Sequence, residues 1–470
     1  MRTRPRILAM LAVVAMLAVL AMTGCTGGPD VPASQPATMP GPTAGQSTVL
    51  PPASAASWPQ YHGNGARTGN VAGLPAAGRL AVAWSARLGG PVYGQPLVIG
   101  STVVAATQTR DEIYGLDLAT GDVRWRTSVG TPASRSQQPC GNVDPLGITS
   151  TGVYDPQTGL AYFVAQSGSR EHVLVGLNPA TGSVRLRQDV PSPDHQPFYD
   201  QQRGALALDA GYVYVVFGGH FGDCGPYIGS VVGMPASGRG QVRSYLVPTS
   251  RQGGIWAPAG PVVGPDGTIY VSVGNGPATA GAYDGSNSVT ALTPSLQRTG
   301  IFAPTDWRAL SATDSDVGSM SPALLGDGKI LQVGKGGTGY LLDARHLGGV
   351  GGQLASGSVC AAFGGAAVSG TVVYVPCRSG GLTAVDTAGS QVRVSWRGPA
   401  DGWGSPVVGG GAVWVASPDS GVLYELSPQT GQIRQQIRMA DSLPNFASPS
   451  LSGNLVLVGT MTGVTAVSGA

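Results

Sequence analysis

Lys335 is a residue whose type and neighbours in the sequence suggest a chemical role. It lies in "ILQVGKGGTGYLLD" at 330–343, directly after Gly334 and before two further glycines. Lysine is unusual in this chain, because only Lys329 and Lys335 are lysines among its 27 basic residues. A cation held among glycines can stabilise negative charge on a bound group. The alternative interpretation is that Lys335 only lines the mouth of a channel.

A second group of polar residues lies in the loop "GGHFGDCGPY" at 218–227, which contains His220, Asp223 and Tyr227. This group could bind an ion or a ligand, or the loop could simply be held in place by its cysteine. The other histidines are scattered and lie near no obvious Ser or Cys nucleophile. Neither a G-x-S-x-G motif nor a phosphate-binding loop occurs in the sequence.

Composition narrows the class of protein. Glycine accounts for 74 of 470 residues, roughly twice the average usage of about 7%. No strict G-X-Y period is present, which excludes collagen. Many glycines among valine-rich runs indicate tight turns between short strands. Charged residues make up 11% of the chain and the net charge is +2, so the basic stripe typical of nucleic-acid binding is missing.

One phrase recurs along the chain and indicates the elements that position these residues. It appears as "IYGLDLATGDVRW" at 113–125, as "LVGLNPATGSVRL" at 174–186 and as "LYELSPQTGQIRQ" at 423–435. Each copy reads as an apolar strand, a Thr-Gly turn and a second strand. The last equivalent residues, Val385, Leu426 and Val467, are spaced by 41 residues. A four-stranded unit of about 40 residues is typical of a β-propeller blade.

Eight unit openings predict an all-β fold, an eight-bladed β-propeller with four-stranded blades over residues 58–470. The openings lie near Pro96, Ile148, Ala205, Pro261, Pro322, Ala366, Pro406 and Pro449. The eighth unit ends at Val467 without a closing strand, and we expect "LAVAWSARL" at 80–88 to supply it. Seven blades are the alternative if the degenerate unit at 205–247 is miscounted. A parallel β-helix competes less well, because its rungs are shorter than this repeat.

The cysteines after residue 25 predict two disulfides. In "CAAFGGAAVSGTVVYVPC", Cys360 and Cys377 flank two strand-like runs joined by a Ser-Gly pair, and a hairpin would place them nearly opposite each other. Cys140 and Cys224 then pair by elimination and bridge two successive units. Free buried thiols are the alternative. No CxxC occurs, so neither zinc nor a redox dithiol has support.

Residues 1–25 are predicted to be a signal peptide. Three arginines precede an apolar stretch from Ile7 to Met22, and "MTGC" ends at Cys25. A small residue directly before this cysteine resembles the cleavage site of bacterial lipoproteins. It implies a lipid on Cys25 that tethers the protein at the extracytoplasmic face of a membrane. An uncleaved anchor or a plain signal peptide is the alternative. Residues 26–57 are rich in Pro, Gly, Ser, Thr and Ala, which predicts a disordered tether.

Two further patterns resemble a known family. The "LxxxTGxxxW" close of the first unit, ending at Trp125, resembles the tryptophan-docking motif of the pyrroloquinoline quinone (PQQ) type propellers. "WPQYHGNGARTGN" at 58–70 resembles the lead-in often seen in that superfamily. The motif is intact only at Trp125, since Trp396 follows a longer insertion and other units carry residues such as Leu186 there. The resemblance implies the fold more strongly than a cofactor, because the same repeat builds propellers that bind no quinone.

Three stretches in the middle units resemble quinoprotein alcohol dehydrogenases, particularly the polyvinyl-alcohol type. They are "VSVGNGPATAGAYDGSNSVTAL" at 271–292, "APTDWRALSATDSDVGSMSPALL" at 303–325 and the glycine-rich stretch around Lys335. The resemblance implies that Asn275 and Asp316 ligate calcium and that Asp316, or Asp314 in its place, acts as a base. It also implies that Lys335 contacts the quinone oxygens. Trp256 follows glycines in "QGGIWAPAG", and its ring could form the floor of the quinone cavity or belong to the core.

The implied chemistry needs these residue types. Calcium prefers oxygen ligands and acts as a Lewis acid beside a quinone, while a carboxylate removes the alcohol proton as hydride leaves. Each residue also has a structural interpretation. Asparagine in a Gly-Asn-Gly turn tolerates positive φ, and Asp314 and Asp316 can be solvated residues of a long insertion. The adjacent cysteines, the calcium-binding glutamate and the CxxCH motif of such dehydrogenases are not found.

The first functional hypothesis is a non-catalytic binding or scaffold lipoprotein at the outer face of the cell envelope. Loops on the rim and the centre of the propeller would decide what binds. In architecture it would resemble the outer-membrane-assembly lipoprotein propeller. The alternatives are a PQQ- and calcium-dependent alcohol or sugar dehydrogenase and an extracytoplasmic sensor of a small ligand. The expected partners are a cell-envelope protein or a small molecule, together with the membrane through the lipid anchor, and no nucleic acid.

Overall fold

The structure is a computed structural model that describes residues 56–168, 170–277 and 281–469. The predicted signal peptide, its lipidation site Cys25 and the predicted tether up to residue 55 lie outside the described residues. Within the described ranges, no helix combines the length and the apolarity that a transmembrane span requires.

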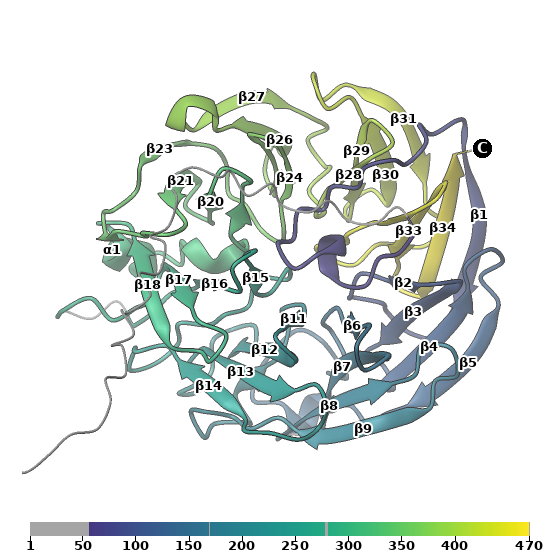
Figure 1. The fold of residues 1–470 in the computed structure, drawn as a ribbon, viewed down its shortest axis with the longest axis horizontal. Coiled ribbons are helices and arrows are strands. Elements are labelled where there is room, and N and C mark those ends of the chain that lie inside the picture. Colours follow the sequence, from purple (N-terminus) through teal and green to yellow (C-terminus); the bar gives the residue numbers. More distant parts are fainter. Residues whose placement is uncertain (1–55, 169, 278–280, 470) are drawn as a thin grey trace, which may run out of the picture. The chain divides into compact units, whose positions relative to one another are not determined.

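The described chain is all-β and forms the predicted eight-bladed propeller (Figure 1). Blades 1 and 2 contain β2 (Leu97–Ile99), β3 (Thr102–Thr107), β4 (Glu112–Asp117) and β5 (Val123–Ser128), then β6 (Val153–Asp155), β7 (Leu160–Ser167), β8 (Glu171–Leu177) and β9 (Val184–Asp189). Blade 3 contains β10 (Asp200–Gln201), β11 (Ala207–Asp209), β12 (Tyr212–Gly219), β13 (Ser230–Pro235) and β14 (Arg243–Leu246). Blade 4 contains β15 (Val262–Val263), β16 (Ile269–Val273), β17 (Ser288–Leu292), β18 (Arg298–Ala303) and β22 (Gly349–Val350).

The second half of the ring repeats this plan. Blade 5 contains β19 (Ala323–Leu324), β20 (Lys329–Val333), β21 (Thr338–Asp343) and β23 (Ala355–Ser358). Blades 6 and 7 contain β24 (Ala367–Ser369), β25 (Val372–Cys377), β26 (Gly381–Asp386) and β27 (Arg393–Arg397), then β28 (Val407–Gly409), β29 (Ala412–Ser417), β30 (Val422–Leu426) and β31 (Ile433–Arg438). Blade 8 contains β32 (Ser450–Ser452), β33 (Leu455–Gly459), β34 (Gly463–Gly469) and β1 (Leu80–Arg87). The short helices are η1 (Tyr61–Gly63), η2 (Arg135–Gln137), α1 (Trp307–Ala312), η3 (Val317–Ser319) and η4 (Ala388–Ser390).

The ring closes through strand β1, as the missing strand of the eighth unit predicted. β1 pairs antiparallel with β34, from Leu80 opposite Gly469 to Arg87 opposite Gly463. Blade 8 therefore combines strands from the two ends of the described chain, which lie side by side in Figure 1. The degenerate unit at 205–247 forms blade 3, so the count is eight and not seven.

The burial pattern explains why these segments form strands. The middle strands, such as "TVVAAT" in β3, are buried at every position, because neighbouring blades cover both faces of each sheet. The outer strands alternate between exposed and half-buried positions, as in β5 and β9. Exposed arginines on these outer strands protect the open sheet edges from pairing with other chains.

Tryptophan side chains dock one blade on the next. Trp125 packs on the Thr-Gly turn of blade 2, where a Cβ on Gly182 would overlap its ring. Trp396 makes the same contact with blade 7, and Trp84 of β1 makes it with blade 1. Each indole N–H donates to a backbone carbonyl of the next blade at 2.9–3.0 Å. The sequence pattern found an intact motif at Trp125 alone, because Trp84 belongs to a strand that reaches its blade from the other end of the chain.

Residues 58–71, the axial segment, occupy the centre of the ring (Figure 1). The segment hydrogen-bonds to seven blades, through Val98, Tyr154, Leu206, Val263, Val368, Val408 and Ser448. Its Arg67 is buried and donates to three backbone carbonyls. Burial lowers the pKa of Arg67 to about 9. The lead-in to the repeat is thus a structural part of the propeller axis.

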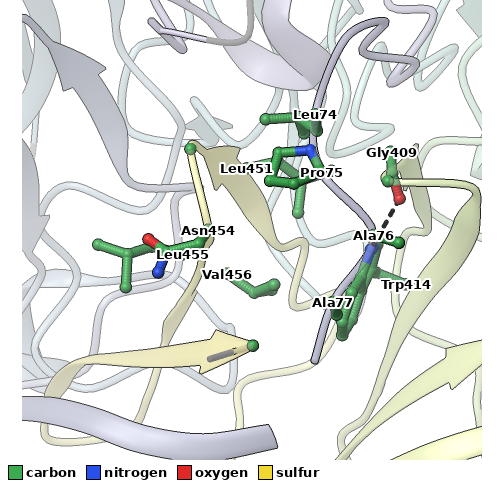
Figure 2. A pocket seen from close by; sticks show the side chains of 13 residues that line it. Leu74, Pro75, Ala76, Ala77, Gly409, Trp414, Leu451, Asn454, Leu455 and Val456 are labelled. Atoms are coloured by element: carbon green, nitrogen blue, oxygen red, sulfur yellow. Dashed lines mark hydrogen bonds between the residues drawn. The ribbon is translucent and has the colours of Figure 1, made fainter. Parts of the chain in front are cut away.

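The chain then crosses from the axis to β1 over blades 7 and 8. Figure 2 shows a pocket along this crossing, lined by Leu74–Ala77, Trp414 and Leu451 among others. Its volume of about 30 Å³ has room for one or two water molecules. We regard this pocket as a packing gap.

Both predicted disulfides are present. Cys360 is joined to Cys377, and Ala362 lies opposite Cys377 in a β-bridge, as the hairpin argument required. Cys140 is joined to Cys224 and connects the loop before blade 2 to the loop between β12 and β13 of blade 3.

Candidate functional site

The structure brings the predicted site residues together at the junction of blades 4 and 5. Asn275 follows β16, and Lys335 follows β20 at the equivalent place in the next blade. Asp314 and Asp316 lie between β18 and β19, in the insertion that contains α1. Trp256 lies in the loop before β15, and its ring is half-buried.

Lys335 is at the centre of this group. Its Nζ lies 2.7 Å from Asp314 Oδ1 and 2.9 Å from Asp316 Oδ2. The ammonium is also 5.5 Å from the centroid of the Trp256 ring. Asn275 contacts both carboxylates, since its backbone N–H donates to Asp316 Oδ1 at 2.6 Å and its Nδ2 donates to Asp314 Oδ1 at 2.8 Å. We refer to these four residues, without Trp256, as the lysine cluster.

The glycines beside Lys335 have a structural cause. The backbone N–H of Lys335 donates to the carbonyl of Asp316 at 2.8 Å. A Cβ on Gly334 would collide with that same carbonyl oxygen, so only glycine allows the two segments to approach. Asn275 is absent from the described residues with positive φ. The conformational explanation for an asparagine in this turn is therefore wrong, and the side-chain hydrogen bonds explain it instead.

Asn287 completes the cluster and was missed by the sequence analysis. Its side chain is 0% exposed. Nδ2 donates to Asn275 Oδ1 at 3.2 Å and to Ser311 Oγ at 2.9 Å, while Oδ1 accepts the backbone N–H of Val317 at 2.9 Å. One side chain thus joins the turn after β16, helix α1 and the start of η3. The only signal in the sequence is an asparagine between two serines directly before a strand.

Burial and neighbouring charges have opposite effects on the pKa values of Asp316 and Lys335. Asp316 is 4% exposed, and this burial raises its pKa although the Lys335 ammonium opposes the rise. Burial by itself would lower the pKa of Lys335, but the carboxylates of Asp316 and Asp314 outweigh it, so the pKa of Lys335 lies above its ordinary value. Lys335 is therefore charged at neutral pH.

The cluster does not fit a calcium ion as it is arranged. The ammonium lies between the two carboxylates that would have to hold the ion, and the Asn275 amide oxygen accepts a hydrogen bond from Asn287. Calcium takes six to eight oxygen ligands. In the described part of the chain, no group of three or more His, Cys, Asp or Glu side chains could hold a metal ion.

The loop at 218–227 does not form one polar site. The Tyr227 hydroxyl donates to Asp223 Oδ1 at 2.6 Å, and burial followed by the carboxylates of Asp223 and Asp316 raises the pKa of Tyr227. His220 is buried, and neither of its ring nitrogens has a hydrogen-bond partner among the described residues. The disulfide at Cys224 holds this loop, which agrees with the structural interpretation of the sequence.

Comparison with known proteins places the chain among related propellers. A family model described as outer membrane protein assembly factor BamB matches residues 67–270 and 306–470. No curated protein shows significant sequence similarity to the chain.

Several solved structures share the fold. Quinohemoprotein alcohol dehydrogenase ADHIIG from Pseudomonas putida HK5 is 15% identical with a TM-score of 0.70, and the match covers 88% of this chain and 80% of that one. The quinohemoprotein alcohol dehydrogenase of Comamonas testosteroni is also 15% identical, with a TM-score of 0.66 and coverage of 87% and 80%. BamB from Moraxella catarrhalis is 14% identical, with a TM-score of 0.52 and coverage of 83% and 97%. At such identities the likeness concerns the fold alone.

Proposed function

Because this chain belongs to the family of the outer membrane protein assembly factor BamB, we propose that it is a non-catalytic binding or scaffold module of the cell envelope. Its two disulfides support a location outside the cytoplasm, because disulfides persist in oxidising compartments. A lipid on Cys25 would hold the module at the membrane, with residues 26–57 as the tether. The partner would be a cell-envelope protein or a small molecule.

The observation that carries this proposal is the closed hydrogen-bonding of the lysine cluster. Lys335 pairs with both carboxylates, and the side chain of Asn275 is used by Asp314 and Asn287. The cluster fastens the insertion between β18 and β19 to the ends of β16 and β20. Such a mutually satisfied network, with Asp316 buried and Asp314 at the surface, positions backbone segments and leaves no free ligand set for a metal. We therefore assign the cluster a structural role.

The test is a titration of the full chain with PQQ, with and without calcium. Tryptophan fluorescence measures binding, and a dye-linked assay measures oxidation of alcohols. We expect that calcium does not change the fluorescence and that no alcohol is oxidised. Lys335→Ala should lower the stability of the protein, whereas Lys329→Ala, which removes the only other lysine, should not. Calcium-dependent binding of PQQ with alcohol oxidation, lost in Lys335→Ala and kept in Lys329→Ala, would disprove the proposal.

A PQQ-dependent dehydrogenase is the second candidate, and one observation favours it. Asn275, Asp316 and Lys335 converge beside the half-buried ring of Trp256, as the resemblance to quinoprotein dehydrogenases implied. For this function the Lys335 ammonium would have to leave the space between the carboxylates when calcium binds. The same titration decides between the two candidates, because only the dehydrogenase requires calcium and quinone together.

A further inference from the structure

Asp111 lies in the turn between β3 and β4 of blade 1 and is not part of the lysine cluster. The residue is 0% exposed and has a φ of 50°, a left-handed conformation that aspartate tolerates better than most residues. Its Oδ2 atom has no hydrogen-bond partner among the described residues. A buried polar atom without a partner costs free energy in the folded protein.

Asp111 holds both ends of the segment 130–147, which lies between β5 and β6 and which we call the connecting lobe. The backbone N–H of Val129 donates to the Asp111 carbonyl at 2.8 Å. The backbone N–H of Ile148 donates to Asp111 Oδ1 at 2.9 Å. One residue thus fixes the chain directly before the connecting lobe and directly after it.

The first and last residues of the connecting lobe pack on the carboxyl group of Asp111. A Cβ added to Gly147 would collide with Oδ1, so only glycine allows this approach. A Cβ added to Gly130 would lie 3.0 Å from Oδ2. Because the group is fully buried with these two glycines against its oxygens, movement of the ends of the lobe is the direct way to hydrate it.

Burial has the largest effect on the titration of this carboxyl group. It raises the pKa of Asp111 to about 7 from an ordinary value of 3.8, although the N–H of Ile148 and the charge of Arg187 oppose the rise. The group is therefore protonated in mildly acidic solution and ionises close to neutral pH.

Arg187 on β9 is the charged group that acts on Asp111 from blade 2. Its guanidinium donates to a backbone carbonyl at 2.6 Å, and among the described residues no ion pair involves Asp111. Of the two chain neighbours, Glu112 accepts the hydroxyl of Tyr114 at 2.6 Å and Arg110 is exposed. An ionised Asp111 would thus have a cation nearby but no ion pair to offset its burial.

The other end of the connecting lobe is linked to blade 3. Cys140 is joined to Cys224 in the loop after β12, and Phe221 in that loop is 70% exposed. At the base of the lobe the contacts are hydrogen bonds, those of Asp111 and one from the Gly168 N–H to the carbonyl of Thr131 at 3.0 Å. The tip is therefore held covalently, whereas the base can open.

We propose that the protonation state of Asp111 controls the base of the connecting lobe, which is closed when the carboxyl group is protonated and favours opening when the group is ionised. Ionisation transfers the proton to the solvent and leaves a buried charge, which becomes hydrated when Gly130 and Gly147 move away. Opening would shift the disulfide-linked loop that carries Phe221. This regulation goes beyond the proposed scaffold function and uses none of the residues of the lysine cluster.

The direction of the pH dependence follows from the two states of the lobe. In the closed lobe the pKa of Asp111 is about 7, whereas a hydrated carboxyl group in the open lobe has the ordinary value of 3.8. The ratio of open to closed lobe therefore rises by about tenfold per pH unit between about pH 4 and about pH 7. Above about pH 7 both states are ionised, and the ratio levels off.

The test is amide hydrogen exchange of the full chain between pH 5 and pH 8, with rates corrected for the intrinsic pH dependence of exchange. Peptides that contain Val129 or Ile148 report on the contact directly, because these N–H groups bond to Asp111. We expect their corrected exchange to rise by about tenfold or more from pH 5 to pH 7 and then to level off. Asp111→Asn keeps an acceptor but cannot ionise, and should stay protected throughout. The matched control is Asp122→Asn, at an exposed position of the same blade.

Arg187→Gln provides a second variant that leaves Asp111 in place. Loss of this cation disfavours the ionised carboxyl group, so exchange should still rise between pH 7 and pH 8. Unchanged exchange between pH 5 and pH 7, the same rise in Asp111→Asn, or levelling at the same pH in Arg187→Gln would each overturn the proposal. A rise that is lost in Asp200→Asn and kept in Asp111→Asn would also overturn it, and would assign the pH dependence to the carboxyl group of Asp200 in blade 3.

Discussion

At the scale of single residues, Asp200 is a buried carboxyl group that should make the stability of the protein depend on pH. Its side chain is 1% exposed, and the side chains of Ser192 and Asp194 are its polar neighbours. Burial, followed by the nearby charge of Asp194, raises the pKa of Asp200 to about 8 from an ordinary value of 3.8. The folded protein therefore holds a proton that the unfolded chain has lost above about pH 4.

From this we predict that the contribution of Asp200 to the free energy of unfolding falls as pH rises from about 4 to about 8, because unfolding then releases the proton of this group. Relative to the wild type, Asp200→Asn should therefore gain stability between pH 5 and pH 8, by an amount on the order of a few kcal/mol at pH 8. Urea unfolding at pH 5 and pH 8 measures the effect. Asp189→Asn, at an exposed position on β9, is the control. An identical pH dependence in the Asp200→Asn variant would contradict this account.

Lys335 gives a second prediction at this scale. Lys335→Ala leaves the Asp316 carboxylate buried without its counter-charge, which costs about 3 kcal/mol in comparable buried pairs. Lys329→Ala removes a lysine whose partner Asp327 is partly exposed, and such surface pairs contribute only about 0–1 kcal/mol. Chemical unfolding of the two variants compares them directly. If both variants lose the same amount of stability, the lysine cluster does not hold the insertion between β18 and β19 in place.

At the scale of elements, the docking of one blade on the next depends on glycine. Gly182 has a φ of 70°, and a Cβ there would overlap the ring of Trp125. Gly100 has a similar φ of 58°, but nothing lies within 4 Å of the position where its Cβ would be. Substitutions at these two positions therefore distinguish the cost of backbone strain from the cost of losing the contact with Trp125.

We predict that Gly182→Ala destabilises the propeller by about 2–3 kcal/mol, since it combines backbone strain with displacement of a docked ring. Gly100→Ala should cost only the strain, about 1 kcal/mol. Thermal unfolding of both variants, with tryptophan fluorescence to report on Trp125, measures the difference. Equal losses would show that the Trp125 contact does not couple blades 1 and 2.

At the scale of the whole molecule, the N-terminal part of the propeller holds the ring together in two ways. The axial segment hydrogen-bonds to seven blades, and β1 completes blade 8. Without β1, the edge of β34 has no partner, and an open sheet edge favours association with other chains. Both contacts connect residues that are far apart in the sequence.

We predict that a chain beginning at residue 72, which keeps β1 but lacks the axial segment, folds with reduced stability. A chain beginning at residue 89 lacks both and should fail to form a stable monomer. Size-exclusion chromatography and near-ultraviolet circular dichroism distinguish these results. A stable monomer from residue 89 onward, with the thermal stability of the full chain, would contradict the role of closure.

The repeat, the count of eight blades, the closing strand at 80–88 and both disulfides could be predicted from the amino-acid sequence. Strands and turns follow from local patterns of apolar residues and glycine, and the recurrence of a four-stranded unit of about 40 residues or more indicates that the units stack as blades. The missing strand after Val467 predicted the pairing of β1 with β34 because a ring cannot leave one blade incomplete. Asn275, Asp316 and Lys335 were found through their resemblance to a family.

Only the tertiary structure decided which side chains are partners. The position of the Lys335 ammonium between two carboxylates and the contacts of Asn287 depend on how separate blades pack around one axis. Segments that are tens or hundreds of residues apart meet there, and no local pattern states the distances between them. The same local repeat is compatible with a calcium–quinone site and with a structural ion pair, and only the folded ring shows that the Lys335 ammonium lies between the two carboxylates.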